Sequence, residues 1–274
     1  MTQPPDVDRR LLDQLIAAAC RAAAAILAVG SDLQQREKAD RSPVTAADEA
    51  AETALLEAFA RVLPGVPVVS EESAHLANPE RLGARFLMVD PLDGTRELIA
   101  GFPDYTVNIA LIDRGRPVAG VIAAPALGTI WAGATGLGAE RLRILPGGAA
   151  GQGRTPIRTR RWPPHGAVAV VSRFHRDRTT DGYLDRFAGI ERVVVGSSIK
   201  FCRIAEGAAD LYVRTNSISE WDVAAGHALM VAAGGAMTGL DGKPLPYGRA
   251  GYRVPPFIGW GDGASPMPGT GSTG

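Results

Sequence analysis

The stretch Phe86-Leu-Met-Val-Asp-Pro-Leu-Asp-Gly-Thr95 joins a short apolar run to a turn that carries two carboxylates. Four apolar residues in a row indicate a buried strand, and the Asp-Pro-Leu-Asp-Gly sequence after them is typical of a turn. Residues 95–100 then have a short helical pattern that ends at Gly101. We expect Asp90 and Asp93 to lie between a strand end and a helix start, close enough to share a hard cation bound through oxygen.

The start of this helix offers a second kind of binding site. The backbone N–H groups of Gly94 and Thr95 have no partner within the helix, and such groups attract phosphate. A structural explanation competes with this one, because Asp-Pro and Asp-Gly are common turn dipeptides and Asp93 alone can cap a helix. The turn by itself favours neither interpretation.

The composition is that of an ordinary globular protein. The chain has 274 residues, 46% of them hydrophobic and 21% charged, enough for one large domain or two small ones. Its 29 basic residues balance 29 acidic ones, so no overall field draws it to a nucleic acid polymer. Cys20 and Cys202 are too few for a disulfide framework or a zinc site, which fits a reducing cytoplasm.

Nothing in the sequence demands a membrane. Arg9-Arg10 before an apolar run faintly resembles an export signal, but Asp13, Gln14 and Arg21 interrupt that run. No stretch reaches the length of a transmembrane helix, so we expect no stable membrane insertion.

The elements before the central turn place further carboxylates. Residues 9–29 have the period of an amphipathic helix ended by Gly30, and Thr45 with Asp48 fits the capping box of a second helix, which favours a capping role for Asp48. A short strand over 66–70 delivers Glu71 and Glu72, which should point to opposite faces, so that at most one of them faces a shared site. Strands that end together bring Glu71 within reach of the two aspartates of the turn.

The remaining chain divides into two patterns. Strands over 105–112 and 118–124 around a five-residue loop, with a third strand over 129–133, indicate a hairpin sheet, so residues 1–150 are predicted to be helices on an antiparallel sheet, an α+β domain. The loop-rich residues 145–166 mark a boundary. Residues 151–262 alternate strand and helix, which is typical of an α/β domain, and residues 263–274 are predicted to be a disordered tail. The predicted elements of the second half are strands over 167–171, 192–196 and 211–213, helical stretches over 183–187 and 198–206, and an apolar helix from Trp221 to Gly234.

The four histidines, His75, His165, His175 and His227, show no ligand spacing. His227 lies in an apolar helix and is expected to be a satisfied core residue. His175, at a predicted strand end, is the one placed to touch a ligand.

Four motifs stand together in this chain and carry a resemblance: residues 43–48, 70–72, 89–95 and 220–226. Together they resemble the inositol monophosphatase superfamily of magnesium-dependent, lithium-sensitive phosphatases, over about residues 11–260. The resemblance implies a layered αβαβα sandwich. Residues 38–48, 105–112, 171–175 and 196–202 narrow it to the 3′(2′),5′-bisphosphate nucleotidase branch, with Lys200 as the discriminating residue.

The resemblance implies a metal site and a catalytic pair. Glu71, Asp90, Asp93, Asp222 and the carbonyl of Leu92 would hold two or three Mg²⁺ ions. Glu71 would also take part in catalysis, and Asp48 with Thr95 would orient and deprotonate the attacking water. This overturns the capping preference for Asp48, and it identifies Asp222, which looks like a helix cap when the sequence is considered alone.

The same resemblance implies the substrate contacts. The reacting phosphoryl group would bind the amides of Gly94 and Thr95 beside Asp222, and the remaining contacts would come from the second half of the chain. These are Ser197, Lys200 and Arg214 for the nucleotide, with Ser172 and His175 on the adenosine side. A salt bridge on a helix flank is the competing explanation for Lys200 and Arg214. Leu98 and the loop 215–219 depart from the family pattern and put fine specificity in doubt.

The resemblance therefore predicts hydrolysis of the 3′-phosphate of adenosine 3′,5′-bisphosphate, giving AMP and phosphate, in support of sulfate assimilation. Two alternatives stay open: a phosphatase for inositol monophosphates or fructose 1,6-bisphosphate, and a catalytically silent, metal-dependent nucleotide sensor. The expected location is the cytoplasm, with peripheral association at the inner membrane and a homodimer left open.

Overall fold

The structure is a computed structural model that describes residues 7–38, 42–74, 79 and 82–262. The predicted tail at 263–274 and His75 lie outside these residues. The helices are α1 Arg9–Val29, α2 Ala46–Val62, α3 Thr95–Ile99, α4 Arg178–Leu184, α5 Ile199–Ala205, the 3-10 helix η3 Glu220–Asp222 and α6 Ala224–Ala232. The strands are β1 Arg36–Glu37, β2 Pro43–Val44, β3 Val68–Ser70, β4 Arg85–Asp93, β5 Thr106–Asp113, β6 Arg116–Ala124, β7 Thr129–Ala134, β8 Gly138–Leu145, β9 Ala149–Ala150, β10 Thr155–Ile157, β11 Val168–Val171, β12 Glu191–Val194, β13 Leu211–Arg214, β14 Ile218–Ser219, β15 Ala236–Gly239, β16 Arg253–Val254 and β17 Phe257–Trp260.

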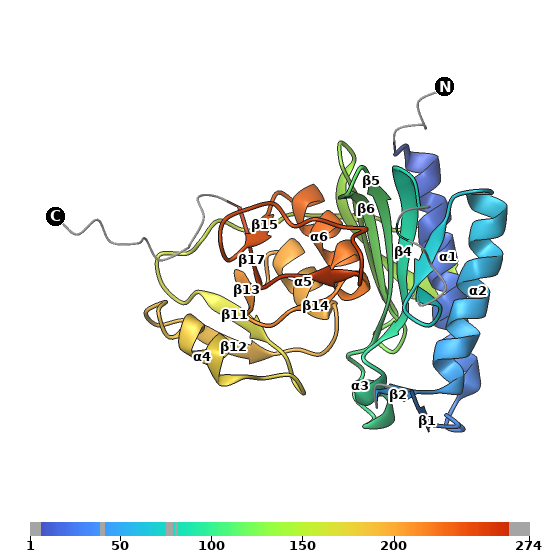
Figure 1. The fold of residues 1–274 in the computed structure, drawn as a ribbon, viewed down its shortest axis with the longest axis horizontal. Coiled ribbons are helices and arrows are strands. Elements are labelled where there is room, and N and C mark those ends of the chain that lie inside the picture. Colours follow the sequence, from blue (N-terminus) through green and yellow to red (C-terminus); the bar gives the residue numbers. More distant parts are fainter. Residues whose placement is uncertain (1–6, 39–41, 75–78, 80–81, 263–274) are drawn as a thin grey trace.

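The first half is a sheet with two helices on one face. Its strand order is β10-β8-β7-β6-β5-β4-β3, and every pair is antiparallel except β3 with β4. The long helices α1 and α2 cover one face (Figure 1). Strand residues such as Leu87, Val89 and Ile109 pack against these helices in one core, which confirms the expected helices on an antiparallel sheet.

Helix α1 corrects one expectation. With 21 residues it is long and apolar enough to cross a membrane, so the prediction that no stretch has that length was wrong. Asp13 and Arg21 lower the mean hydropathy of this helix only slightly, because the rest of it is rich in alanine, leucine and isoleucine. In the structure Leu12, Leu15 and Ile16 are buried, which is the environment of a core helix. Length and composition alone are weak evidence for a membrane span.

Two turns differ from the sequence prediction. The loop between β5 and β6 has two residues rather than five, because Arg114 (φ 50°) and Gly115 (φ 72°) form a tight hairpin turn whose twist suits the flanking strands. Strand β4 runs on through the Asp-Pro-Leu-Asp turn, and a break in its pairing with β5 lies between Asp90 and Asp93. The irregularity allows both aspartates to leave the sheet at one point.

The second half is a five-stranded sheet with helices on both faces. Its order is β12-β11-β13-β17-β15, parallel for β11, β12 and β13. Helix α4 begins at Arg178, ahead of the predicted 183–187, because the Asp177 side chain caps it by accepting from the Thr180 N–H (2.9 Å). Trp221 and Asp222, predicted to begin an apolar helix, lie in η3 just before α6.

Helices α5 and α6 lie between the two sheets (Figure 1). Helix α6 approaches the first sheet so closely that a Cβ atom on Gly120 would lie 2.2 Å from the carbonyl oxygen of Ala225. One core includes Ile122 of the first sheet and both Phe201 and Phe257 of the second half. The layers run α1/α2, sheet, α5/α6, sheet, α4, so the predicted αβαβα sandwich is confirmed.

The predicted division at residue 150 falls within the first sheet. Strand β10, Thr155–Ile157, still pairs with β8 of that sheet. The assignment of domains on either side of residue 150 stays a prediction.

Candidate active site

Three carboxylates from three elements meet where the first sheet faces η3. Glu71 follows β3, Asp90 lies in β4 and Asp222 ends η3, and each offers an oxygen within 4.8 Å of the others'. Asp90 is 1% exposed, and its Oδ1 accepts from the Leu92 N–H at 3.0 Å. Its other oxygen, Oδ2, is buried without a hydrogen-bond partner. A donor set of carboxylate oxygens with one such atom unsatisfied fits a hard divalent cation.

The electrostatics of this cluster point the same way. Burial, with Glu71 and Asp93 adding repulsion, raises the pKa of Asp90 well above its usual range. Burial, with Asp93 and Glu71 next, does the same to the pKa of Asp222. Because like charges this close disfavour one another, the cluster requires protons or cations to be stable. The group could therefore bind a metal ion.

The two remaining predicted ligands lie beside the cluster. The carboxylate of Asp93 is held by the Ser198 hydroxyl, which donates to its Oδ2 at 2.8 Å, and by the Asn108 amide at 3.4 Å. The carbonyl of Leu92 accepts from the Thr95 hydroxyl at 3.3 Å. Both residues line the same pocket as the cluster, and their ligation of a metal stays a prediction.

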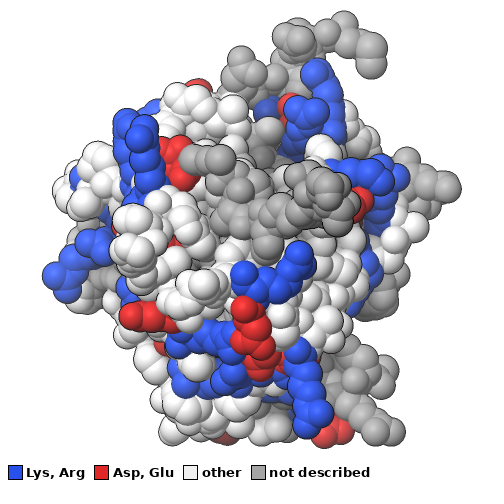
Figure 2. All heavy atoms as spheres, turned by 90° about the vertical axis from the view of Figure 1, so that its left-hand side faces the viewer, with Lys and Arg blue, Asp and Glu red and all other residues white. Residues whose placement is uncertain are grey.

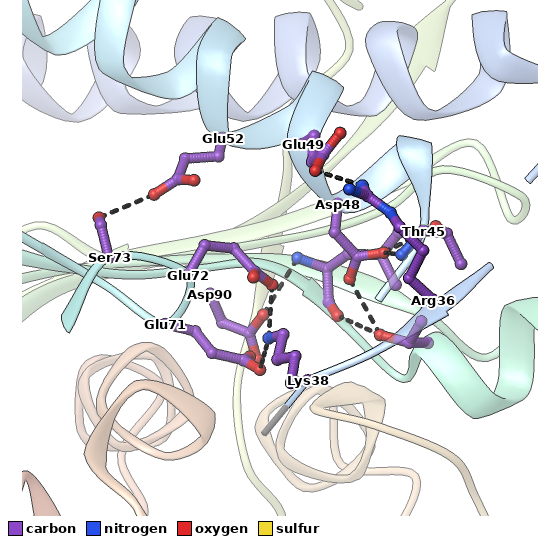
Figure 3. Close-up of polar contacts among 12 residues, drawn as sticks. Arg36, Lys38, Thr45, Asp48, Glu49, Glu52, Glu71, Glu72, Ser73 and Asp90 are labelled. Carbon is purple, nitrogen blue, oxygen red and sulfur yellow. Dashed lines mark hydrogen bonds and ion pairs between the residues drawn. The ribbon is translucent and has the colours of Figure 1, made fainter. Parts of the chain in front are cut away.

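Lys38 is a cation that the sequence analysis did not assign to the site. Its amine donates to Glu71 and to Glu72, each at 2.8 Å, beside Asp90 (Figure 3). Residues 71–73 form a turn and not an extended strand, so both glutamates reach Lys38, but of the two only Glu71 belongs to the carboxylate cluster and lines its pocket. Although burial alone would lower it, Glu71 and Glu72 raise the pKa of Lys38 above its usual value. The only sequence signal for Lys38 was its place at the start of the 38–48 motif.

Asp48 has both of the roles considered for it. Its Oδ2 accepts from the N–H (2.8 Å) and the hydroxyl (2.7 Å) of Thr45, which completes the capping box of α2. Its Oδ1 accepts from the Thr95 hydroxyl at 3.0 Å, across 47 residues of sequence. Burial raises the pKa of Asp48, against the bonds from Thr45 and Thr95. The cap therefore fixes a carboxylate whose free side faces Thr95.

One pocket of about 310 Å³ collects the predicted site. Asp48 does not line this pocket and is linked to it by its hydrogen bond to Thr95. Every other predicted residue lines it: Glu71, Asp90, Leu92, Asp93, Gly94, Thr95, Ser172, His175, Ser197, Lys200, Arg214 and Asp222. No signal in the sequence pointed to Arg96, Glu97 and Arg253, which also line it, because charged residues on a short helix or a two-residue strand carry no distinguishing pattern.

Two cations, Lys200 and Arg214, also line the pocket, and we call the part that they line its cationic end. Residue Lys200 is 5% exposed and its amine donates to the Ser197 carbonyl at 2.6 Å, while the Nε of Arg214 is buried without a partner. Neither residue forms an ion pair within the described chain, so the alternative of a salt bridge on a helix flank was wrong. Burial, with Arg214 next, lowers the pKa of His175, which keeps its ring neutral near pH 7. His227 is instead a core residue bonded to the Tyr247 hydroxyl (2.9 Å), as predicted.

Comparison with known proteins agrees with this geometry. Residues 8–262 match the inositol monophosphatase family. The 3′(2′),5′-bisphosphate nucleotidase CysQ of Escherichia coli (strain K12) is 39% identical over 240 residues, which cover 86% of this chain and 94% of that protein. A histidinol-phosphatase of Mycobacterium tuberculosis (strain ATCC 25618 / H37Rv) is 32% identical and covers 79% of this chain and 82% of its own.

Solved structures extend the comparison. The crystal structure of CysQ from Bacteroides thetaiotaomicron aligns with a TM-score of 0.76 and 33% identity, over 92% of this chain and 97% of that one. An inositol monophosphatase from Anabaena sp. PCC 7120 aligns with a TM-score of 0.73 and 28% identity, over 93% and 91% of the two chains.

Proposed function

The chain belongs to the inositol monophosphatase family, and from this premise we propose that it is a magnesium-dependent phosphatase that hydrolyses the 3′-phosphate of adenosine 3′,5′-bisphosphate to AMP and phosphate. Such an activity would remove a by-product of sulfate assimilation. The relatives named 3′(2′),5′-bisphosphate nucleotidase, which cover most of the chain, support the substrate.

One observation carries the proposal: a single pocket is lined by a carboxylate cluster and by two cations, Lys200 and Arg214, that form no ion pair within the described chain. A phosphate monoester is a dianion that carboxylates repel, so the cluster suits it only with metal ions bound. A substrate with one phosphate would need only this cluster and its metal ions to bind its phosphate. Lys200 and Arg214 suit a second anionic group on the same substrate, the first as a point charge and the second as a fork.

We propose that Glu71, Asp90, Asp93, Asp222 and the carbonyl of Leu92 hold two or three Mg²⁺. When bound, these ions supply water activation and neutralise charge on the leaving oxygen. The oxygen of water forms a bond to phosphorus while the bond from phosphorus to the 3′ oxygen breaks.

The chain's own groups guide that displacement. The Thr95 hydroxyl, bonded to Asp48 at 3.0 Å, orients the water, and Asp48 takes up its proton. A carboxylate whose pKa is raised by burial suits this role better than an ordinary one. The amides of Gly94 and Thr95 hold the reacting phosphoryl group, and Ser197, Lys200 and Arg214 hold the other phosphate, with Ser172 and His175 beside the adenosine.

The alternatives make different demands on the pocket. An inositol monophosphate has no second phosphate for Lys200 and Arg214 to bind, whereas fructose 1,6-bisphosphate has one, so only direct comparison of turnover separates that sugar from the nucleotide. A silent nucleotide sensor would not need Asp48 aligned on Thr95. The histidinol-phosphatase relative adds histidinol phosphate to the substrates worth testing.

The partners follow from the surface. Figure 2 shows Lys and Arg side chains mixed with Asp and Glu on the face formed by the second half. Several arginines of the second half are paired, as Arg176 with Asp181 (3.1 Å) and Arg192 with Asp185 (2.5 Å). We therefore propose a small nucleotide and no nucleic acid polymer as partner, with a cytoplasmic location.

The test is phosphate release from adenosine 3′,5′-bisphosphate, inositol 1-phosphate, fructose 1,6-bisphosphate and histidinol phosphate, with Mg²⁺ and with excess chelator. We expect a magnesium-dependent preference for the nucleotide. Preference for another substrate would replace the substrate assignment and keep the phosphatase. Nucleotide and metal binding without phosphate release would favour the sensor.

A further inference from the structure

A run of side-chain hydrogen bonds joins the two halves of the chain beneath the pocket. Gly196, Ser197 and Ser198, just before α5, contact Asp104, two residues before β5, and Thr106 and Asn108 of β5, and we call these six residues the seam. The contacts are Asp104 Oδ2 with the Gly196 N–H (3.1 Å), Thr106 with Ser197 (hydroxyl to hydroxyl, 3.0 Å) and Asn108 Nδ2 with the Ser198 hydroxyl (2.8 Å). Alternate residues of extended backbone share one face, which is why three β5-side residues meet three consecutive loop residues.

The hydrogen bonds of the seam run in one direction. The Thr106 hydroxyl donates to Asn108 Oδ1 (3.0 Å), so Ser197 must donate to Thr106. The Asn108 amide donates to Ser198, and Ser198 donates to Asp93 Oδ2 at 2.8 Å. All four links are buried or nearly so, and the chain of donors ends on a charged acceptor, which strengthens each bond before it.

The seam also fixes the backbone that presents Lys200. Ser197 has φ +43°, a left-handed conformation that is energetically unfavourable for a serine and persists only where the surrounding contacts hold it. Its carbonyl accepts from the Lys200 amine at 2.6 Å. No side chain fits at Gly196, where a Cβ atom would lie 2.7 Å from that of Asp104. At its outer end, Asp104 accepts from Arg173 at 2.5 Å.

We propose that Thr106 and Asn108 are positioning residues that set the distance between the phosphoryl end of the pocket and its cationic end, and so determine selectivity for substrates with two anionic groups. The seam reaches Asp93 at one end and carries Ser197 and Lys200 along its length. This inference rests on the proposed function and adds to it residues that do not contact the substrate.

The physical argument separates two classes of substrate. A monophosphate touches only the end with Asp93, Gly94 and Thr95. A bisphosphate must meet both ends at once, so any loosening of the loop before α5 raises the cost of binding it. Loss of the seam should therefore penalise bisphosphates selectively.

The test compares Thr106→Val with Thr129→Val. Both changes replace a threonine hydroxyl by a methyl group in the same sheet, but Thr129 donates only to the Leu127 carbonyl, away from the pocket. For Thr106→Val we expect kcat/KM for adenosine 3′,5′-bisphosphate to fall about tenfold, mainly through KM, as for a lost hydrogen bond. Turnover of p-nitrophenyl phosphate should change less than twofold. Thr106→Ser should restore selectivity, and Thr129→Val should match the wild type.

A second measurement needs no turnover. In the chelated protein, amide hydrogen exchange of residues 196–198 should become faster in Thr106→Val and stay unchanged in Thr129→Val. Unchanged selectivity, or an equal fall for both substrates, would overturn the proposal. Failure of the wild-type protein itself to prefer the bisphosphate would instead overturn the proposed function, and the exchange rates would still decide whether Thr106 orders this loop.

Discussion

The two ends of the pocket hold their charges in different ways. At one end Glu71, Asp90 and Asp222 are crowded by rigid elements, and burial raises the pKa of Asp90 and Asp222. At the other, Lys200 is held by backbone carbonyls and has no carboxylate partner within the described chain. The cluster has more carboxylates than Lys38 can neutralise, and Lys200 and Arg214 form no ion pair within the described chain. The comparison teaches that the site is arranged for ligands that supply the missing charges, at a cost to the empty fold.

The largest effect is expected from Asp90→Asn. Loss of this carboxylate should lower turnover of every phosphate ester on the order of a thousandfold, since the proposed metal site would lose a buried ligand. The chelated variant should be at least as stable to heat as the wild type, because one repelling charge is gone. Phosphate release and thermal unfolding measure the two effects.

Glu140→Gln is the matched control. Glu140 is also a buried carboxylate, but it accepts from Arg9 and Arg154, each at 2.6 Å, away from the pocket. Its loss should lower stability and leave turnover unchanged. If Asp90→Asn retained most of its activity, the assignment of the carboxylate end to metal binding would be wrong.

A change at the cationic end should be smaller and selective. Lys200→Met keeps the shape of the buried chain and removes its charge, so kcat/KM for adenosine 3′,5′-bisphosphate should fall about 10- to 100-fold, the usual range for a lost charged hydrogen bond. Hydrolysis of p-nitrophenyl phosphate should change less than threefold. Lys243→Met, at an exposed lysine paired with Asp241, is the control. An equal loss of activity on both substrates would contradict the assignment of Lys200 to a second anionic group.

The carboxylate end also predicts a pH dependence of the free energy of unfolding. Because the folded pKa of Asp90 and Asp222 lies above the unfolded value of about 4, the folded chain binds more protons above that pH. With chelator present, stability should therefore decrease as pH rises from about 4 toward the raised folded pKa, by roughly 1.4 kcal/mol for each proton and pH unit. Added Mg²⁺, or Asp90→Asn, should flatten the curve. Denaturant titrations that show a flat curve for the chelated wild type would contradict this expectation.

The smallest effect has the opposite slope and comes from outside the pocket. Burial lowers the pKa of His227 to about 4, below the unfolded value of about 6.5, so the unfolded chain takes up a proton that the folded chain does not. Stability should fall as pH drops through this window, by about 1.4 kcal/mol at pH 5.5. His227→Gln, measured with Mg²⁺ present, should lose this slope. An unchanged slope would mean that groups other than His227 cause this pH dependence.

The sequence predicted those parts of the site that rest on local patterns. Hydrophobic periods located α1 and α2, and two strands ending together correctly brought Glu71 to Asp90. The capping signature of Thr45 identified the helix start but concealed the second contact of Asp48, to Thr95, which depends on tertiary structure.

The unpredicted parts rest on contacts between segments far apart in the chain. Ser198 meets Asp93 across 105 residues and Asn108 meets Ser198 across 90, and no period or spacing in the sequence encodes such pairs. Lys38 lies in a polar segment after β1, where the sequence has no period that would predict where a side chain points. Asp222 was found by resemblance alone, because an aspartate at a helix start is explained equally well as a cap.

The close approach of α6 to Gly120 also bears on how the chain is made. The face of β5, β6 and β7 that α6 covers is synthesised well before α6 leaves the ribosome, so this apolar surface is exposed during translation. The first half therefore cannot bury its second face as a nascent chain, and the protein completes its fold only after most of the polypeptide has emerged.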